Sequence, residues 1–191
     1  MINMNVQGKE IYRGIVVYDN VLEATEEIIS VGKEDDRWVE SKVFIDGEQK
    51  VSAHDRETQI LLLPPTVDHD PMWYFIAKAL KGYGYIYANS YRAFFQSMEF
   101  PQMLHYPENT GFYTDHVDSE PGIQRIFSAV LYLNTVEEGG ETHFPDIGVS
   151  VKPVAGRLVM FPANYLYRHQ ALPPISNEKF CIVTWYREDN G

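Results

Sequence analysis

The chain has 191 residues, enough for one compact domain with a sizeable core, and its 45% hydrophobic and 23% charged residues are ordinary for a globular protein. Its net charge of −11 and the lack of any lysine- or arginine-rich run argue against nucleic acid as a partner, because affinity for phosphates depends on basic residues. It has no apolar run of about 18 or more residues and no apolar secretory segment at the N-terminus, so we expect a cytoplasmic protein that does not enter a membrane.

The N-terminal half predicts one strand and two helices. Residues Ile11–Tyr18 alternate irregularly between apolar and polar types, which favours a strand. Asn20 is placed to cap a helix over Val21–Val31, which has acidic residues near its start. A second helix is expected over Met72–Leu80, because a proline stands at its first turn and its apolar residues form one stripe. Gly82 is expected to end this helix.

The long polar segment Lys33–Arg56 predicts a loop that contains one short strand around Val43–Ile45. It is a candidate wall for a substrate groove, because loops that order over substrates tend to be polar and to make few core contacts.

From about Tyr91 the sequence changes to short β-rich runs separated by turns. The expected strands are Phe94–Met98, Gln102–Tyr106, Ile126–Leu133, Thr142–Phe144, Val149–Val151, Leu158–Phe161, His169–Leu172 and Lys179–Tyr186. Eight short strands after a helical preface predict a mainly β jelly roll, with the helices bracing the outside of one sheet. No repeat or linker divides residues 1–191, and the single Cys181 sits in an apolar run that predicts a buried structural thiol.

His116-Val117-Asp118 is the most informative motif. Side chains alternate along a strand, so His116 and Asp118 should share a face, with Val117 turned into the core. His169, 51 residues after Asp118, can supply a third ligand from a neighbouring strand. Two imidazoles and one carboxylate suit a non-haem Fe(II) oxygenase site. An isolated His-x-Asp also occurs on polar surface strands, and Lys179 could equally be an exposed charge at a strand end, so spacing alone leaves both interpretations open.

Seven segments occur in an order that resembles the catalytic core of Fe(II)/2-oxoglutarate-dependent dioxygenases, and within them the prolyl 4-hydroxylase-like group. They are Tyr106-Pro107, His116-x-Asp118, Leu131-Tyr132-Leu133-Asn134, Gly139-Gly140-Glu141-Thr142-x-Phe144-Pro145, Pro153-x-x-Gly156-Arg157-Leu158-x-x-Phe161, His169 and Lys179-Phe180-x-x-x-x-Trp185. The resemblance covers about residues 100–187. It departs from the family after His169, where a form like His-x-Gly-x-Pro is usual and this chain has Gln170-Ala171-Leu172-Pro173.

The resemblance implies a double-stranded β-helix, a cupin-like jelly roll, and an enzyme that couples decarboxylation of 2-oxoglutarate to hydroxylation of a C–H bond. The implied metal ligands and catalytic residues are His116, Asp118 and His169, and the implied co-substrate residues are Tyr106, Tyr132, Thr142 and Lys179. Fe(II) and 2-oxoglutarate would be the cofactors, with ascorbate as an additional candidate. The implied substrate is a peptidyl prolyl residue, so a peptide or protein partner is favoured over a small molecule. The resemblance also implies lids over the substrate at Lys33–Arg56 and Thr66–Asp70, and neither segment carries a recognisable substrate signature.

Other interpretations stay open. The enzyme could hydroxylate another peptidyl side chain or a free amino acid, or the chain could be a cupin-like metal-binding protein or a peptide-binding scaffold without oxygenase activity. Lys179 with Tyr106 argues against a bare metal site, which has no need of a dicarboxylate clamp. His105 and His143 each neighbour an implied pocket residue, so alternation should turn them away from the metal. His54 and His69 are expected on the surface.

Three further residues have two interpretations each. Trp185 could wall the pocket or simply pack in the core, and Arg125 and Arg157 could make structural ion pairs or substrate contacts. The Gly139-Gly140 pair predicts a turn, because glycine adopts positive φ at little cost. The sequence does not indicate the oligomeric state.

Overall fold

A computed structural model describes residues 3–4, 6–45, 48–63, 71–119, 122 and 124–189. The helices are α1 (Thr25–Glu34), α2 (Pro71–Tyr91) and the short 3-10 helix η1 (Tyr165–Tyr167). The strands are β1 (Lys9–Tyr12), β2 (Ile15–Tyr18), β3 (Val39–Glu40), β4 (Val43–Ile45), β5 (Glu48–Lys50), β6 (Arg56–Glu57), β7 (Gln59–Leu62), β8 (Ser97–Met98), β9 (Gln102–Tyr106), β10 (Phe112–His116), β11 (Arg125–Tyr132), β12 (Thr142–Phe144), β13 (Val149–Val151), β14 (Leu158–Pro162), β15 (His169–Ala171) and β16 (Lys179–Arg187).

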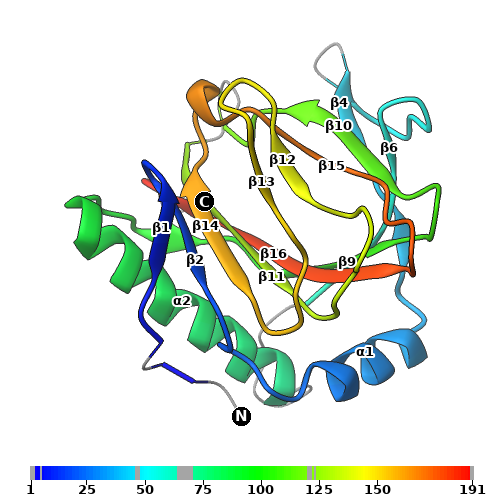
Figure 1. Cartoon of the computed structure of the whole chain (residues 1–191), viewed down its shortest axis with the longest axis horizontal. Coiled ribbons are helices and arrows are strands. Elements are labelled where there is room, and N and C mark those ends of the chain that lie inside the picture. The colour runs from blue at the N-terminus through cyan, green and yellow to red at the C-terminus, as the bar shows by residue number, and fades with distance from the viewer. Residues whose placement is uncertain are drawn as a thin grey trace.

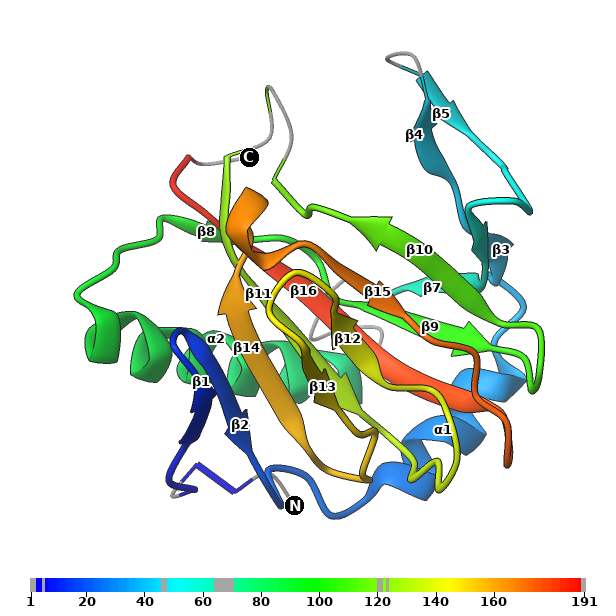
Figure 2. The ribbon, with the colours of Figure 1, turned by 45° about the horizontal axis from the view of Figure 1, so that its top comes forward.

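Two antiparallel sheets face each other in the described part of the chain. The larger has nine strands in the order β1-β2-β14-β11-β16-β9-β7-β3, with β8 paired to β16, and the smaller has five in the order β13-β12-β15-β10-β6. Strands β4 and β5 form a separate hairpin. Both helices lie against one face of the larger sheet, and the smaller sheet covers the other (Figures 1 and 2). The predicted jelly roll, or double-stranded β-helix, with helices outside one sheet is confirmed.

The core has two layers because side chains of the central strands alternate between the faces of the larger sheet. Along β16, Phe180, Ile182 and Tyr186 pack with the helices. Cys181 and Val183, the residues between them, pack in the space between the two sheets. This alternation decides which side chains reach the space between the sheets, where the candidate site lies.

Helix α2 is longer than the sequence predicts. It continues through Gly82 and Gly84 to Tyr91, so the expected end at Gly82 is wrong. Glycine costs a helix about 1 kcal/mol relative to alanine, but the extra turns bury Tyr83 and Tyr87 against the larger sheet. Gly84 also lets the helix approach the ring of Tyr186, which fills the space that a side chain would need.

The N-terminal elements also differ from the prediction. The expected single strand Ile11–Tyr18 is a hairpin of β1 and β2, which turns at Gly14 with φ of 79°. Helix α1 begins at Thr25 and has no side-chain cap. Asn20 instead turns the chain with φ of 59°, and the amide of Val21 bonds to the carbonyl of Gly156. The predicted helix start is therefore wrong, because the amide of Val21 is bonded to Gly156 and the chain bends before the helix begins at Thr25.

Several strands lie where none was expected. Segment Lys33–Arg56 contains β3, β4 and β5 and ends at the first residue of β6, whereas one strand was predicted. Strands β7 and β10 were also missed, and the expected strand Phe94–Met98 is reduced to β8. The missed strands are short or polar and are held by pairing with distant strands, such as β10 with β15, so local patterning does not reveal them. The predicted lid segment Thr66–Asp70 and His69 lie outside the described residues.

Neither of the two α-helices in the described part of the chain combines the length and the apolar character that crossing a bilayer requires.

Paired glycine substitutions test the packing of α2. Gly84→Ala should destabilise the fold by about 1–3 kcal/mol, because the new methyl group overlaps the buried ring of Tyr186. Gly82→Ala is the matched control in the same helix: its methyl group meets only the mobile end of Met4, and alanine favours helix. Urea unfolding followed by circular dichroism measures both. Equal free energies of unfolding for the two variants would contradict the close packing of α2 on β16.

Candidate metal and co-substrate site

Three potential metal ligands meet between the two sheets. His116 ends β10, His169 begins β15, and the two are cross-strand partners. Their Nε2 atoms lie 3.5 and 3.6 Å from the two carboxylate oxygens of Asp118. One ligand atom from each residue lies within 4.8 Å of the others. Asp118 follows the end of β10, and Val117 is only half-buried, so the expected continuous strand with Val117 in the core is wrong although the two ligands do converge.

Backbone contacts fix the tautomers of both histidines. Nδ1 of His116 lies 2.8 Å from the carbonyl oxygen of Thr114, and Nδ1 of His169 lies 3.1 Å from that of Tyr167. A carbonyl oxygen only accepts, so each Nδ1 carries the proton and each Nε2 keeps a free lone pair beside Asp118. Burial, helped by the neighbouring His116, lowers the pKa of His169 to about 4. His169 is therefore neutral at pH 7, as a metal ligand needs to be.

Asp118 is buried yet ionised. Burial opposes its charge, but the hydroxyl of Ser128 donates to Oδ2 at 2.6 Å and favours the ionised form, and the pKa of the carboxyl lies well below its usual range. Two imidazole nitrogens and one carboxylate oxygen on one side of a shared point form a donor set that fits a divalent transition metal with open positions.

Lys179 lies in the same cavity and is 1% exposed, so the alternative of an exposed strand-end charge does not apply. Its Nζ donates to the carbonyl oxygen of Gly140 at 2.9 Å and lies 3.9 Å from the ring centroid of Tyr106. The predicted Gly139-Gly140 turn, with φ of 76° and 75°, presents that carbonyl. Burial lowers the pKa of Lys179 to about 8.

The remaining predicted pocket residues join Lys179. Tyr106, Tyr132 and Thr142 all line the cavity, and the Tyr132 hydroxyl lies 2.6 Å from Oγ1 of Thr142. Burial raises the pKa of both tyrosines, so their hydroxyls stay protonated and can donate. The structure thus brings together the seven side chains that the sequence singled out: His116, Asp118, His169, Tyr106, Tyr132, Thr142 and Lys179.

Sequence reasoning missed several side chains of the cavity, among them Ser128, Tyr113 and Arg56. Ser128 shares the parity of Tyr132 on β11, so alternation along that strand could have found it. Tyr113 stacks on His116 with ring centroids 3.6 Å apart. Its position three residues before a candidate ligand only weakly predicts this contact. The guanidinium of Arg56 lies 4.4 Å from the ring centroid of Tyr113 and donates to Thr58. No local sequence pattern predicts that Arg56 lines the cavity.

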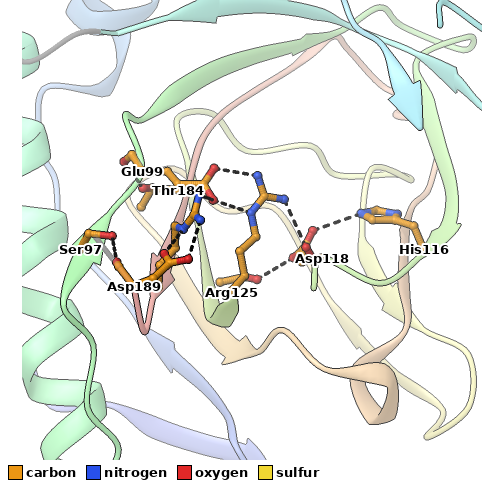
Figure 3. A network of polar contacts seen from close by, with 9 residues as sticks. Ser97, Glu99, His116, Asp118, Arg125, Thr184 and Asp189 are labelled. Atoms are coloured by element: carbon orange, nitrogen blue, oxygen red, sulfur yellow. Dashed lines mark hydrogen bonds and ion pairs between the residues drawn. The ribbon is translucent and has the colours of Figure 1, made fainter. Parts of the chain in front are cut away.

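Arg125 links the site to the end of β16 (Figure 3). Its guanidinium makes a two-point contact with Glu99 at 2.6 and 2.7 Å and donates to the backbone carbonyl of Asp118 at 3.2 Å. It also lies 3.8 Å from the ring centroid of Trp185, which lines the cavity. Arg125 is thus structurally paired, and Trp185 walls the pocket. Arg157 is paired with Asp19 at 2.6 Å.

Of the described histidines, His54, His105 and His143 lie outside the group of three ligands. His105 contacts Glu178 at 2.8 Å on the opposite face of β9 from Tyr106, as alternation predicts. His143 contacts Ser150, and His54 is exposed. Cys181 is buried, and burial raises the pKa of its thiol to about 11, which fits the predicted structural role.

Comparison with known proteins assigns this geometry to a family. Residues 101–187 match the model of the 2OG-Fe(II) oxygenase superfamily. A putative prolyl 4-hydroxylase of Acanthamoeba polyphaga mimivirus is 32% identical over 126 residues, which cover 54% of this chain and 52% of that protein. The chain thus spans about half the length of this relative.

Two solved structures share the fold across nearly the whole chain. The viral collagen prolyl hydroxylase of Paramecium Bursaria Chlorella virus-1, in its 2OG complex, has a TM-score of 0.70 at 20% identity and covers 92% of this chain and 97% of that one. A Trichoplax adhaerens prolyl hydroxylase bound to a hypoxia inducible factor peptide has a TM-score of 0.68 at 16% identity and covers 92% of this chain and 84% of that one.

Residues 101–187 therefore belong to the 2OG-Fe(II) oxygenase superfamily, and within it the chain is similar to the prolyl 4-hydroxylases. Membership implies Fe(II) as the metal and 2-oxoglutarate as the co-substrate, and the donor set of His116, Asp118 and His169 fits that metal.

The pKa of Lys179 predicts how 2-oxoglutarate affinity depends on pH. The free protein loses the lysine proton above about pH 8, and a neutral amine attracts a carboxylate weakly. The dissociation constant should be flat below pH 8 and should rise above it, approaching about tenfold per pH unit. Calorimetry on protein loaded with Mn(II), between pH 6.5 and 9.5, measures this. Lys179→Met should bind about ten- to 150-fold more weakly and lack the pH dependence. Constant wild-type affinity across the range would contradict the role of Lys179.

Proposed function

We propose that this chain is an Fe(II)- and 2-oxoglutarate-dependent dioxygenase that hydroxylates a prolyl residue within a peptide. The observation that carries the proposal is one cavity that holds both a three-ligand metal set and a buried cation. A metal-binding protein without oxygenase activity would not need Lys179, whose burial is costly. An anionic molecule that binds beside the metal would offset the cost of burying Lys179.

The three ligands would hold the metal with little rearrangement. Their histidine tautomers are set by Thr114 and Tyr167, and Asp118 contributes the one negative charge. A divalent ion would keep a net positive charge in the cavity, which favours an anionic co-substrate. When bound, Fe(II) and 2-oxoglutarate supply the oxidising chemistry, in which dioxygen and 2-oxoglutarate are converted to succinate and carbon dioxide while a C–H bond becomes C–OH.

The other end of the cavity would hold the far carboxylate of 2-oxoglutarate. Lys179 supplies the charge, and the hydroxyl groups of Tyr106, Tyr132 and Thr142 are donors in reach of the same space. Leu104, Val183 and other apolar side chains wall the cavity and exclude water. Exclusion of water strengthens the contact between Lys179 and the carboxylate and protects reactive species from side reactions.

A prolyl peptide is the substrate that the relatives favour. The mimivirus relative is named a putative prolyl 4-hydroxylase, and the Trichoplax enzyme was solved with a peptide. We infer that all 191 residues act as one domain, because β1, β2, β3 and β7 from the N-terminal half are strands of the larger sheet. Ascorbate should act as an accessory reductant and extend the number of turnovers.

The deciding experiment is formation of succinate from 2-oxoglutarate with Fe(II), measured against proline-containing peptides and against free amino acids, with mass spectrometry of the product. Peptide-dependent succinate and a mass gain of one oxygen on proline are expected. Faster turnover of a free amino acid than of any peptide would replace the prolyl proposal with a small-molecule hydroxylase. No succinate under any condition would remove the oxygenase proposal itself.

Substitution of the ligands tests the metal site. Wild type should bind one Mn(II) per chain, and His116→Ala, Asp118→Ala and His169→Ala should each weaken binding by about tenfold or more. His143→Ala is the control, because His143 lies on β12 outside the ligand group. Isothermal titration gives stoichiometry and affinity. Unchanged Mn(II) binding in the folded ligand variants would remove these residues from the site.

The β4–β5 hairpin is a candidate wall for the peptide. It rises from the edge of the fold beside β10 and β6, and Arg56 of β6 lines the cavity (Figure 2). Replacement of residues 42–51 by two glycines should abolish peptide hydroxylation but leave slow peptide-independent decay of 2-oxoglutarate, because no metal or co-substrate residue is removed. Succinate assays with and without peptide measure both. Full peptide activity in the shortened protein would exclude a role for the hairpin in holding substrate.

A further inference from the structure

Arg168 connects three elements that surround the candidate metal site. It directly precedes His169, and its guanidinium makes a two-point contact with Asp146, Nε to Oδ2 at 3.0 Å and Nη2 to Oδ1 at 2.7 Å. Its third nitrogen, Nη1, donates to Asp115 at 2.6 Å. Asp146 lies in the turn between β12 and β13, and Asp115 lies on β10 directly before His116. One side chain thus joins the segments that carry both histidine ligands.

The ion pairs of Arg168 lie next to the two histidine ligands along the chain but on a more exposed side of the strands. Arg168 and Asp115 are each 44% exposed, whereas the neighbouring His169 and His116 are 8% and 18% exposed. The pairing of β10 with β15 shifts register between Tyr113 and His116, so the backbone ladder is irregular where the histidines face each other. A side-chain contact across the same two segments can supply the alignment that an interrupted ladder lacks.

We propose that Arg168 is a positioning residue that holds His116 and His169 at metal-binding separation through its contacts with Asp115 and Asp146. This inference rests on the proposed function. The guanidinium fork suits the task, because its planar two-point contact fixes both distance and angle, whereas a lysine ammonium would fix neither. Arg168 touches no substrate or metal in this role and acts only through the two strands that carry the ligands.

The direction in which divalent-metal affinity changes in Arg168 variants separates a positioning role from a purely electrostatic one. Arg168 places a positive charge next to a metal ligand, and a nearby cation disfavours a second cation. If charge alone mattered, Arg168→Met should bind a divalent metal more tightly than wild type. If Arg168 positions the histidines, the same variant should bind more weakly, although its charge has become more favourable. Arg168→Lys keeps the charge and loses the fork, so it isolates the geometric part.

The experiment is Mn(II) titration of the full chain, followed by electron paramagnetic resonance, without 2-oxoglutarate. Arg168→Met should weaken binding by about three- to tenfold, in line with the loss of two partly exposed ion pairs, and Arg168→Lys should lie between it and wild type. Arg157→Met is the matched control, because Arg157 pairs with Asp19 at the same 2.6 Å but away from the ligands. Its Mn(II) affinity should equal that of wild type.

Equal or tighter Mn(II) binding by Arg168→Met would overturn the inference while leaving the metal site in place. If Arg168→Met does not fold, Arg168→Lys decides, and wild-type affinity in that variant would overturn the inference. Absence of Mn(II) binding by wild type, or unchanged binding in His116→Ala, would overturn the proposed function and this inference with it.

Discussion

The register of β16 against its neighbours β9 and β11 is the constraint on which the site depends. Lys179 is the cross-strand partner of Tyr106, and Cys181 is the partner of Tyr132. Because side chains alternate, this register turns these residues into the space between the sheets and Phe180 toward the helices. A slip by one residue would exchange Lys179 and Phe180 between the two layers. The apolar residues of both core layers oppose such a slip, so ordinary packing keeps the pocket cation in place.

The same packing buries two charged groups. Asp118 and Lys179 are compensated separately: Asp118 by the hydroxyl of Ser128, Lys179 by one carbonyl and the ring of Tyr106. Among the described residues, no carboxylate lies within ion-pair distance of Lys179, and its lowered pKa reflects that poor compensation. A divalent metal beside Asp118 and a dicarboxylate beside Lys179 would add the opposite charges. Both should therefore stabilise the native state by mass action, since the unfolded chain offers neither site.

The sequence was sufficient to single out side chains that the structure brings together, because the predicted ligands and Lys179 lie within an ordered set of motifs. It also predicted the jelly roll, since alternation over eight short runs is a strong pattern. It failed where tertiary contacts override local signals. Gly82 predicts the end of a helix, but α2 continues because its next turns pack against Tyr186. Asn20 predicts a helix cap, but Val21 bonds to Gly156 and the helix begins later. Arg168 and its partners lie 22 and 53 residues apart, and no local pattern joins them.

The site divides between two parts of the chain in a way that bears on specificity. Residues 101–187 carry the three candidate metal ligands, Lys179, and Arg125 and Arg168, which contact the segments of these ligands. Arg56 is the cavity residue that lies N-terminal to this match, and it enters through the pairing of β6 with β10. Loops and short strands around a site can vary while the scaffold that carries its ligands stays the same. A change near Arg56 could therefore alter which substrate the proposed enzyme accepts without moving His116, Asp118 or His169.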